Sequence, residues 1–250
     1  MCLILIAHRP AEQIPLLVLA NRDEFYARPT AAAGPWEECP ELIGGRDLVS
    51  GGSWFGTRGA RWASVTNIRE GIRHSHSHRS RGWLVRDYLL GNSSPQEFMA
   101  TITGQTAEYA GFNLLLGDGD ELWYGNNRGL SGRLLEPAIY GLSNHLLDTP
   151  WPKVVEAKQA LADLLAQPRF DREQAFAIMT ETTPAPDSAL PDTGIPLEWE
   201  RALSAAFIVK ENYGTRCTTF LQRSNAGRHL LVERRFKCDP KTWDQGAFTW

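Results

Sequence analysis

Two apolar runs near the start of the chain predict a β-hairpin. Residues 2–8 and 16–24 are rich in leucine, isoleucine and valine, and a short break containing Pro10 and Pro15 separates them. The second run ends in the polar cluster Asn21-Arg22-Asp23-Glu24. Antiparallel pairing brings this cluster back beside the start of the first run, where Cys2 stands. We therefore expect a thiol and a charged cluster at one end of the same hairpin.

The rest of the pattern predicts strands at both ends of the chain with helices grouped between them. Expected strands cover residues 54–56, 61–67, 112–116, 122–124, 139–142, 205–209, 216–221 and 230–236. Expected helices cover residues 81–91, 95–103, 149–166 and 171–180. Breakers make residues 27–53 and 182–200 long loops, and loops of that length often cover a pocket. Strands that follow one another in hairpins favour an antiparallel α+β fold over a doubly wound one.

Composition narrows the function classes. The 250 residues carry a net charge of -3, which gives no broad attraction to nucleic acid or to an anionic membrane. Apolar runs stay far below the roughly 20 residues that span a bilayer, so no stable membrane insertion is expected. The four cysteines are scattered without a Cys-x-x-Cys pair, which suits a reducing cytoplasm. We expect a single cytoplasmic domain over residues 1–250 that handles a small-molecule ligand and requires no cofactor.

The position of Cys2 predicts a nucleophile. If the start methionine is removed, Cys2 carries a free α-amine beside its thiol, and groups that titrate at about 8 and 8.5 can exchange a proton. Asp23 can hold the resulting ammonium, with Arg22 available to lower the pKa of the thiol. Asn67 and Asn144 each follow a predicted strand and can donate to an oxyanion. This is the logic of N-terminal nucleophile hydrolases.

Each of these residues also has a plainer interpretation. A cysteine at a strand start is often a small buried hydrophobe. The Asn21–Glu24 cluster can be a structural network, and asparagines after strands often form turns. His74, His76 and His78 alternate in a polar segment with few acidic neighbours, so an exposed surface is favoured there over metal or haem ligation. Cys39-Pro40 could offer a thiolate to haem iron, but a Cys-Pro pair in a loop often occurs by chance. No metal site is predicted.

Motifs in one order along the chain resemble the NRDE family, also called the transport and Golgi organisation family. The start Met1-Cys2 and the Asn21–Glu24 cluster carry the resemblance. Further matches are Gly51–Gly56, Val65-Thr66-Asn67, Ser80-Arg81-Gly82, Gly111–Leu114, Leu142-Ser143-Asn144 and Tyr213-Gly214-Thr215-Arg216. The resemblance implies an N-terminal-nucleophile-like fold, a four-layer αββα sandwich of antiparallel sheets. It also implies either haem trafficking or the handling of acyl-CoA and lipid.

A weaker likeness is to the bile salt hydrolase and penicillin V acylase group. There a Met-Cys start is followed by Asn-x-Asp on the second strand, which matches Asn21-Arg22-Asp23 and points to Asp23 as the catalytic aspartate. Asn67 and Asn144 resemble the asparagines of that group near the oxyanion. The arginine that precedes Asn-x-Asp in bile salt hydrolases is Ala20 here, which leaves Arg22 or Arg216 to tune the thiol.

Two functions follow as hypotheses. In the first, Cys2, Asp23, Asn67 and Asn144 hydrolyse or transfer the acyl group of an amide or thioester. In the second, the same pocket binds haem or acyl-CoA as cargo without catalysis. In both, Asn21, Arg22, Glu24 and Arg216 are the expected ligand-binding residues. A scaffold role has no specific feature in its favour.

Overall fold

Two antiparallel sheets with their helices form the described part of the chain. The computed structural model describes residues 2–11, 14–71, 79–129 and 131–250, and for Cys2 and Ala11 the backbone alone. Contacts within the chain divide it into two compact units. The first contains the N-terminal segment up to Ala27 and Pro137–Thr249, and the second contains most residues from Arg28 to Glu136. The predicted α+β class with antiparallel sheets is confirmed, and a single domain over residues 1–250 stays a prediction.

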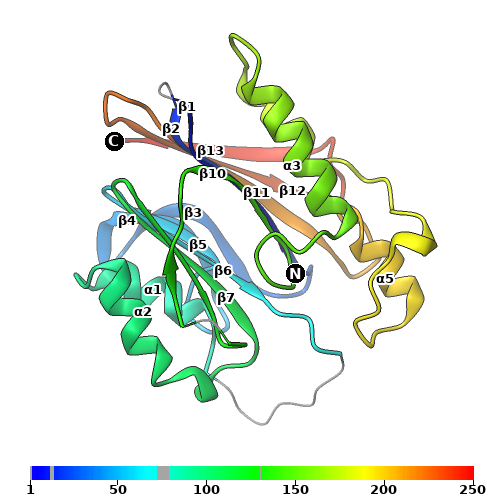
Figure 1. Ribbon diagram of the computed structural model, residues 1–250, viewed down its shortest axis with the longest axis horizontal. Coiled ribbons are helices and arrows are strands. Elements are labelled where there is room, and N and C mark those ends of the chain that lie inside the picture. Colours follow the sequence, from blue (N-terminus) through cyan, green and yellow to red (C-terminus); the bar gives the residue numbers. More distant parts are fainter. Residues whose placement is uncertain (1, 12–13, 72–78, 130) are drawn as a thin grey trace. The chain divides into compact units, whose positions relative to one another are not determined.

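The sheet of the first unit is built around the N-terminal hairpin (Figure 1). Its strands, in spatial order, are β10 (Ala138–Leu142), β1 (Cys2–Ala11), β2 (Ile14–Phe25), β11 (Tyr213–Arg223), β12 (His229–Phe236) and β13 (Trp243–Thr249). Aliphatic side chains on β1 and β2 suit a pleated, buried surface, and the register pairs Leu5 with Leu19. The predicted hairpin is confirmed. Strands β10 and β2 flank β1, and the pairing with β10 begins at Ile4 whereas the pairing with β2 begins at Cys2.

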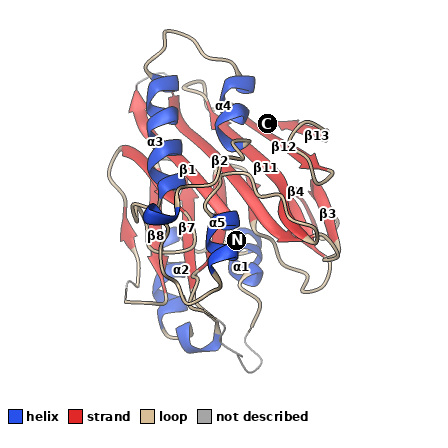
Figure 2. Cartoon of the chain, turned by 90° about the vertical axis from the view of Figure 1, so that its right-hand side faces the viewer, coloured by secondary structure: helices blue, strands red, loops and turns tan. Residues whose placement is uncertain are grey.

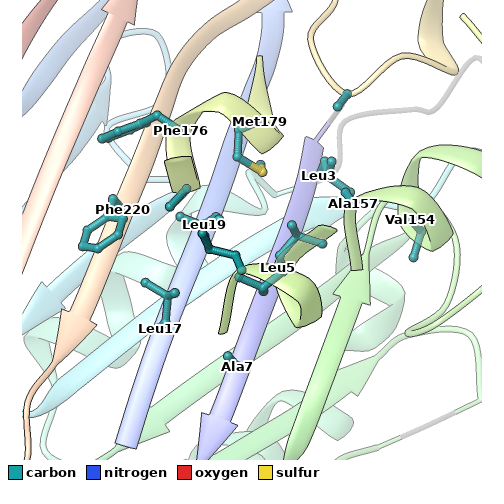
Figure 3. Packing of buried hydrophobic residues seen from close by; sticks show 14 of the residues in the cluster. Leu3, Leu5, Ala7, Leu17, Leu19, Val154, Ala157, Phe176, Met179 and Phe220 are labelled. Atoms are coloured by element: carbon teal, nitrogen blue, oxygen red, sulfur yellow. The ribbon is translucent and has the colours of Figure 1, made fainter. Parts of the chain in front are cut away.

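One face of this sheet is covered by α3 (Pro152–Leu165) and α4 (Arg172–Met179) (Figure 2). Alternate residues of β1 and β2 point to these helices because side chains on a strand alternate between faces. Leu3, Leu5, Leu17 and Leu19 are fully buried there (Figure 3). The apolar stripe predicted for α3 meets them through Val154, Ala157, Leu161 and Leu164. Each large aliphatic side chain buried in this way contributes about 1.5–3 kcal/mol.

The second unit has its own sheet, which α1 (Gly82–Leu90) and α2 (Pro95–Thr103) contact. Its strands, in spatial order, are β3 (Thr30–Trp36), β4 (Cys39–Asp47), β5 (Phe55–Arg58), β6 (Arg61–Asn67), β7 (Phe112–Asp118), β8 (Glu121–Asn126) and β9 (Arg133–Leu134). Ser94 caps α2 as predicted: its hydroxyl accepts from the backbone N–H of Glu97, and the Glu97 carboxylate accepts from Ser94. Helix α2 therefore begins where its sequence predicts.

The long loop predicted over residues 27–53 is wrong, because most of it forms β3 and β4. Pro35 is tolerated because β3 is an edge strand of the sheet. Gly44 and Gly45 do not turn the chain but allow close packing. A Cβ on Gly45 would lie 2.1 Å from the Trp54 ring, and one on Gly44 would lie 2.8 Å from the Phe55 carbonyl oxygen.

Three further expectations differ from the structure near the C-terminus. The loop predicted over residues 182–200 contains the short η2 (Asp187–Ala189), and α5 (Leu197–Leu203) begins within it. The strand predicted over residues 205–209 is absent from this described segment, apart from an isolated bridge between Val209 and Gly214. There the backbone N–H groups of Phe207 and Ile208 donate to Glu181 and to the Thr215 side chain. Strands β9 and β13 were not predicted, because both are mostly exposed and lack an apolar run.

Candidate functional site

Polar residues of the first unit gather where β1 begins and β2 ends. The backbone of Cys2 lies opposite Arg22 on β2. The next residue of β2 is Asp23, whose carboxylate is buried. On the other side of β2, Asp23 lies opposite Thr215 and Asn21 opposite Thr218. The same sheet face that carries Leu17 and Leu19 thus continues into Asn21 and Asp23. Apolar packing along the hairpin therefore determines where these polar side chains lie.

Asn21 uses its amide group within the protein. Its Nδ2 donates to the carbonyl oxygens of Met179, at 2.8 Å, and of Ala206, at 2.9 Å. Its Oδ1 accepts from the hydroxyl of Thr218 at 2.5 Å. Both N–H groups are occupied, so Asn21 fastens the end of α4 and the segment before β11 to the sheet. We infer a structural role, and ligand binding by Asn21 stays a prediction.

Asp23 is a carboxylate held inside the fold. Its Oδ1 accepts from the Thr215 hydroxyl at 2.7 Å, and that hydroxyl accepts from the backbone N–H of Ile208 at 2.9 Å. Burial raises the pKa of Asp23 above its usual 3.8, because a desolvated carboxylate is disfavoured. The charge of the N-terminal amine opposes this effect most strongly, and the charge of Lys153, the Thr215 hydrogen bond and the charge of Arg22 act in the same direction as the amine. Asp23 is thus a buried carboxylate whose negative charge is balanced by several nearby positive groups.

A bulge in β11 brings a second arginine to this strand end. The register shifts between Thr215 and Cys217, so Arg216 is the extra residue. Its Nη1 donates to the Phe25 carbonyl oxygen at 2.9 Å. Burial lowers the pKa of Arg216, and the nearby charge of Arg22 lowers it further. Two guanidinium groups this close favour an anion beside them.

Glu24 faces a different environment from the three residues before it. It is only half-buried, and its Oε1 accepts from the backbone N–H of Phe25 at 2.8 Å. It lies opposite Gly214 on β11. The four residues of the polar cluster therefore divide into a buried part, Asn21 to Asp23, and Glu24 at its edge. Ligand binding by Glu24 stays a prediction.

Asn144 reaches the same end of the sheet from the other side of β1. Leu142 on β10 lies opposite Ile4, so Ser143 and Asn144 continue toward the level of Cys2. Both side chains are buried, and the Ser143 hydroxyl donates to Asn144 Oδ1 at 3.4 Å. The hydrogen bond at the Asn144 oxygen orients its amide, which suits it to donate from nitrogen.

Asn67 ends β6 in the second unit, and its predicted part in the site stays a prediction. The residue before it belongs to a buried polar row across three strands. Asn113 donates to Thr66 at 3.0 Å and accepts from the Tyr124 hydroxyl at 2.8 Å, and Asn126 donates to that hydroxyl at 3.2 Å. This row accounts for Thr66 and Asn113 of the sequence motifs as a satisfied internal network.

Sequence reasoning missed Thr215, Thr218 and Lys153 as members of the cluster. Thr215 stands in the Tyr213–Arg216 motif, but its contact with Asp23 depends on strand pairing across 192 positions. Lys153 had a local signal. It is a cation in the first turn of α3, where the helix dipole disfavours positive charge, so its presence there calls for a partner.

Two further observations concern metals and membranes. Among the residues that the structure describes, no three His, Cys, Asp or Glu side chains gather to hold a metal ion. His74, His76 and His78 lie outside the described residues. None of the helices in the described ranges is long and apolar enough to cross a bilayer.

Comparison with known proteins gives consistent relatives over nearly the whole chain. A family model described as Transport and Golgi organisation 2 matches residues 1–238. A Bos taurus protein named Transport and Golgi organization protein 2 homolog is 32% identical, covering 92% of this chain and 90% of its own. The Homo sapiens protein of that name is 31% identical, with 88% and 86% covered.

One solved structure shares the architecture. It is a Caenorhabditis elegans ortholog of N-acylethanolamine-hydrolyzing acid amidase, with a TM-score of 0.51 over 88% of this chain and 92% of that chain. The two sequences are 13% identical, so the likeness shows the fold alone. That fold is the N-terminal nucleophile hydrolase fold, as expected from the sequence.

Proposed function

The chain belongs to the Transport and Golgi organisation 2 family, and from that premise we propose that it is a cytoplasmic enzyme that removes an acyl group from an amide or thioester. Removal of Met1 frees the α-amine of Cys2. The thiol proton passes to this amine, and the sulfur attacks the acyl carbon while the carbonyl electrons move to oxygen. Asp23 holds the ammonium, and the Asn144 amide donates to the oxyanion.

The second half of the reaction regenerates the enzyme. As the carbonyl re-forms, the C–N or C–S bond breaks, and the leaving amine or thiol takes the proton from the Cys2 ammonium. The product is a thioester between the acyl group and Cys2. Water then attacks this thioester with the amine as base, and the carboxylic acid leaves as the thiol is restored. No external oxidant, reductant or metal is required by these steps.

The observation that carries the proposal is the strand register. Cys2 lies opposite Arg22, next to the buried carboxylate of Asp23, while Asn144 follows β10 on the other side of β1. A buried carboxylate and a buried amide at the first residue of a strand are the parts that a terminal nucleophile needs. The neighbouring charges of Arg22 and Arg216 favour acyl donors that carry an anionic group.

The proposal is tested by intact-mass spectrometry of the acylated protein. Purified protein is incubated with p-nitrophenyl hexanoate and with hexanoyl-CoA. We expect a mass gain of one acyl group that disappears in Cys2→Ala, because only Cys2 has the amine and Asp23 beside it. Cys238→Ala is the matched control, since Cys238 is an exposed free thiol, and it should keep the adduct. An adduct that survives Cys2→Ala, or none with either donor, would contradict the proposal.

The cationic pair also supports a second candidate, the binding of haem or acyl-CoA as cargo. Both molecules carry anionic groups that two adjacent guanidiniums can bind. In a haem titration followed by absorbance, cargo binding should give a saturable spectrum with one equivalent bound. Arg22→Gln should weaken this binding about tenfold or more, the loss of one charge-assisted hydrogen bond. Arg133→Gln, on exposed β9, is the control and should bind as the unchanged chain does. Equal affinity in all three would exclude the cationic pair as the cargo site.

A further inference from the structure

Lys153 is a buried lysine at an unfavourable place in its helix. It follows Pro152 in the first turn of α3, and its side chain is 3% exposed. The positive end of the helix dipole lies in that turn, so a cation there is disfavoured by up to about 1 kcal/mol. Removing an ammonium from water costs several kcal/mol more. A lysine at this position requires an anion nearby.

Glu156 and Glu181 line the same pocket as Lys153 but are exposed, whereas Asp23 is a buried carboxylate. Lys153 and Asp23 both belong to the first unit, and Asp23 lies on the sheet face that α3 and α4 cover. The charge of Lys153 acts on Asp23 and lowers its pKa against the effect of burial. Asp23 is 2% exposed, so the attraction operates largely out of water, where it is stronger than at the surface. Two buried opposite charges from α3 and β2 thus compensate each other.

We propose that Lys153 is a positioning residue, whose ammonium pairs with the Asp23 carboxylate inside the fold and keeps it oriented. Thr215 holds one oxygen of that carboxylate from β11, and Lys153 supplies one of the balancing charges from α3. The catalytic meaning of this pair rests on the proposed function. The pair itself does not, because it concerns the folded chain alone.

A pocket gives access to Lys153 from outside. It has a volume of about 200 Å³ and lies between α3, α4 and the segment around Ala206. Lys153 and four alanines contribute to its wall, and the small side chains leave the space open: Ala157, Ala160, Ala177 and Ala206. This volume corresponds to about six or seven water molecules. If Lys153 is shortened, a small alkylammonium ion can enter and replace its charge.

A double-mutant cycle on the unfolding equilibrium tests the pair without reference to catalysis. Lys153→Met removes the positive charge of α3 from the buried Asp23 carboxylate, so the unfolding constant should rise about a hundredfold or more. In Asp23→Asn/Lys153→Met both charges are gone, so the rise should be at least tenfold smaller than the product of the two single changes. Lys158→Met is the matched control. Lys158 lies on the same helix in an exposed pair with Asp148, and this substitution should change the constant by less than about fivefold. Effects that multiply independently would overturn the proposal.

Chemical rescue distinguishes a charge from mere packing. In Lys153→Ala, propylammonium chloride should lower the unfolding constant about tenfold more than the same concentration of sodium chloride does. Isobutanol, neutral and similar in size, should not. Lys153→Arg should keep most of the stability, because it keeps the charge. Equal effects of propylammonium and isobutanol would overturn the pair as an electrostatic contact.

Measuring acylation of Cys2 on the same variants separates this inference from the proposed function. If Lys153 positions Asp23, Lys153→Ala should slow adduct formation about a hundredfold or more, with recovery in propylammonium. Coupling in the cycle without any adduct in the unchanged protein would defeat the proposed function and keep the pair. An adduct formed normally by Lys153→Ala would defeat the positioning role and keep the proposed function.

Discussion

Asn21→Ala is expected to lower the free energy of unfolding by about 3–5 kcal/mol. The substitution leaves three buried groups without a partner: the carbonyl oxygens of Met179 and Ala206 and the hydroxyl of Thr218. Each unsatisfied buried polar group costs about 1–3 kcal/mol, which is more than the hydrogen bond itself contributes. Urea denaturation followed by circular dichroism measures the loss.

Asn225→Ala provides the control for the amide itself. Asn225 lies in the exposed turn between β11 and β12, where water replaces any lost contact. Its substitution should change the free energy of unfolding by about 0.5 kcal/mol or less. If Asn21→Ala were equally mild, the three contacts of Asn21 would not hold α4 and the segment before β11 to the sheet.

Gly214→Ala should lower the free energy of unfolding by about 3 kcal/mol, at the upper end for overpacking. The new Cβ would lie 2.2 Å from the Tyr26 hydroxyl oxygen and 2.5 Å from the Ile208 carbonyl oxygen. The Tyr26 side chain can move, but the Ile208 carbonyl is held by the backbone N–H of Thr215 at 2.9 Å. Relief must therefore shift the segment that supports Thr215, and with it the contact to Asp23.

Two comparisons locate the strain. In Tyr26→Phe/Gly214→Ala the hydroxyl clash is gone but the carbonyl clash stays, so only part of the stability should return. Gly34→Ala is the matched control in a strand, because a Cβ there meets nothing within 4 Å. It should leave the melting temperature nearly unchanged. Full recovery in the double variant would mean that the Ile208 carbonyl yields easily and that Thr215 is not displaced.

Asn21 and Gly214 each belong to a sequence motif whose role in the fold cannot be deduced from the sequence alone. Asn21 is a structural amide at the start of the polar cluster. Asp23 is the buried carboxylate of the cluster, and the Thr215 hydroxyl holds it in place. In the Tyr213–Arg216 motif, Gly214 permits the close approach of Tyr26. Thr215 binds Asp23, and Arg216 is the bulged residue beside Arg22. The Tyr213–Arg216 motif on β11 thus supports the Asn21–Glu24 cluster on the neighbouring strand β2.

The sequence alone was sufficient for the features that local patterns encode. The N-terminal hairpin follows from its aliphatic runs, the buried stripe of α3 from the spacing of Val154, Ala157 and Leu161, and the start of α2 from the Ser94 cap. Cys2, Asp23 and Asn144 could be named as candidates from their strand ends, and their part in a site stays a prediction. For the hairpin, the stripe of α3 and the Ser94 cap, the interacting residues are close in sequence or share one period, so the pattern contains both partners.

Only the tertiary structure decided the rest. Gly45 resembles a turn residue until Trp54 is seen to pack against it, which is why β3 and β4 were missed. Lys153 stands out in the sequence as a cation in the first turn of a helix, but the sequence does not show its partner, because Asp23 lies 130 positions earlier in the chain. The physical reason is that the effect of a glycine or a charge depends on what the fold places against it. Local sequence cannot show a partner that arrives from another strand or helix.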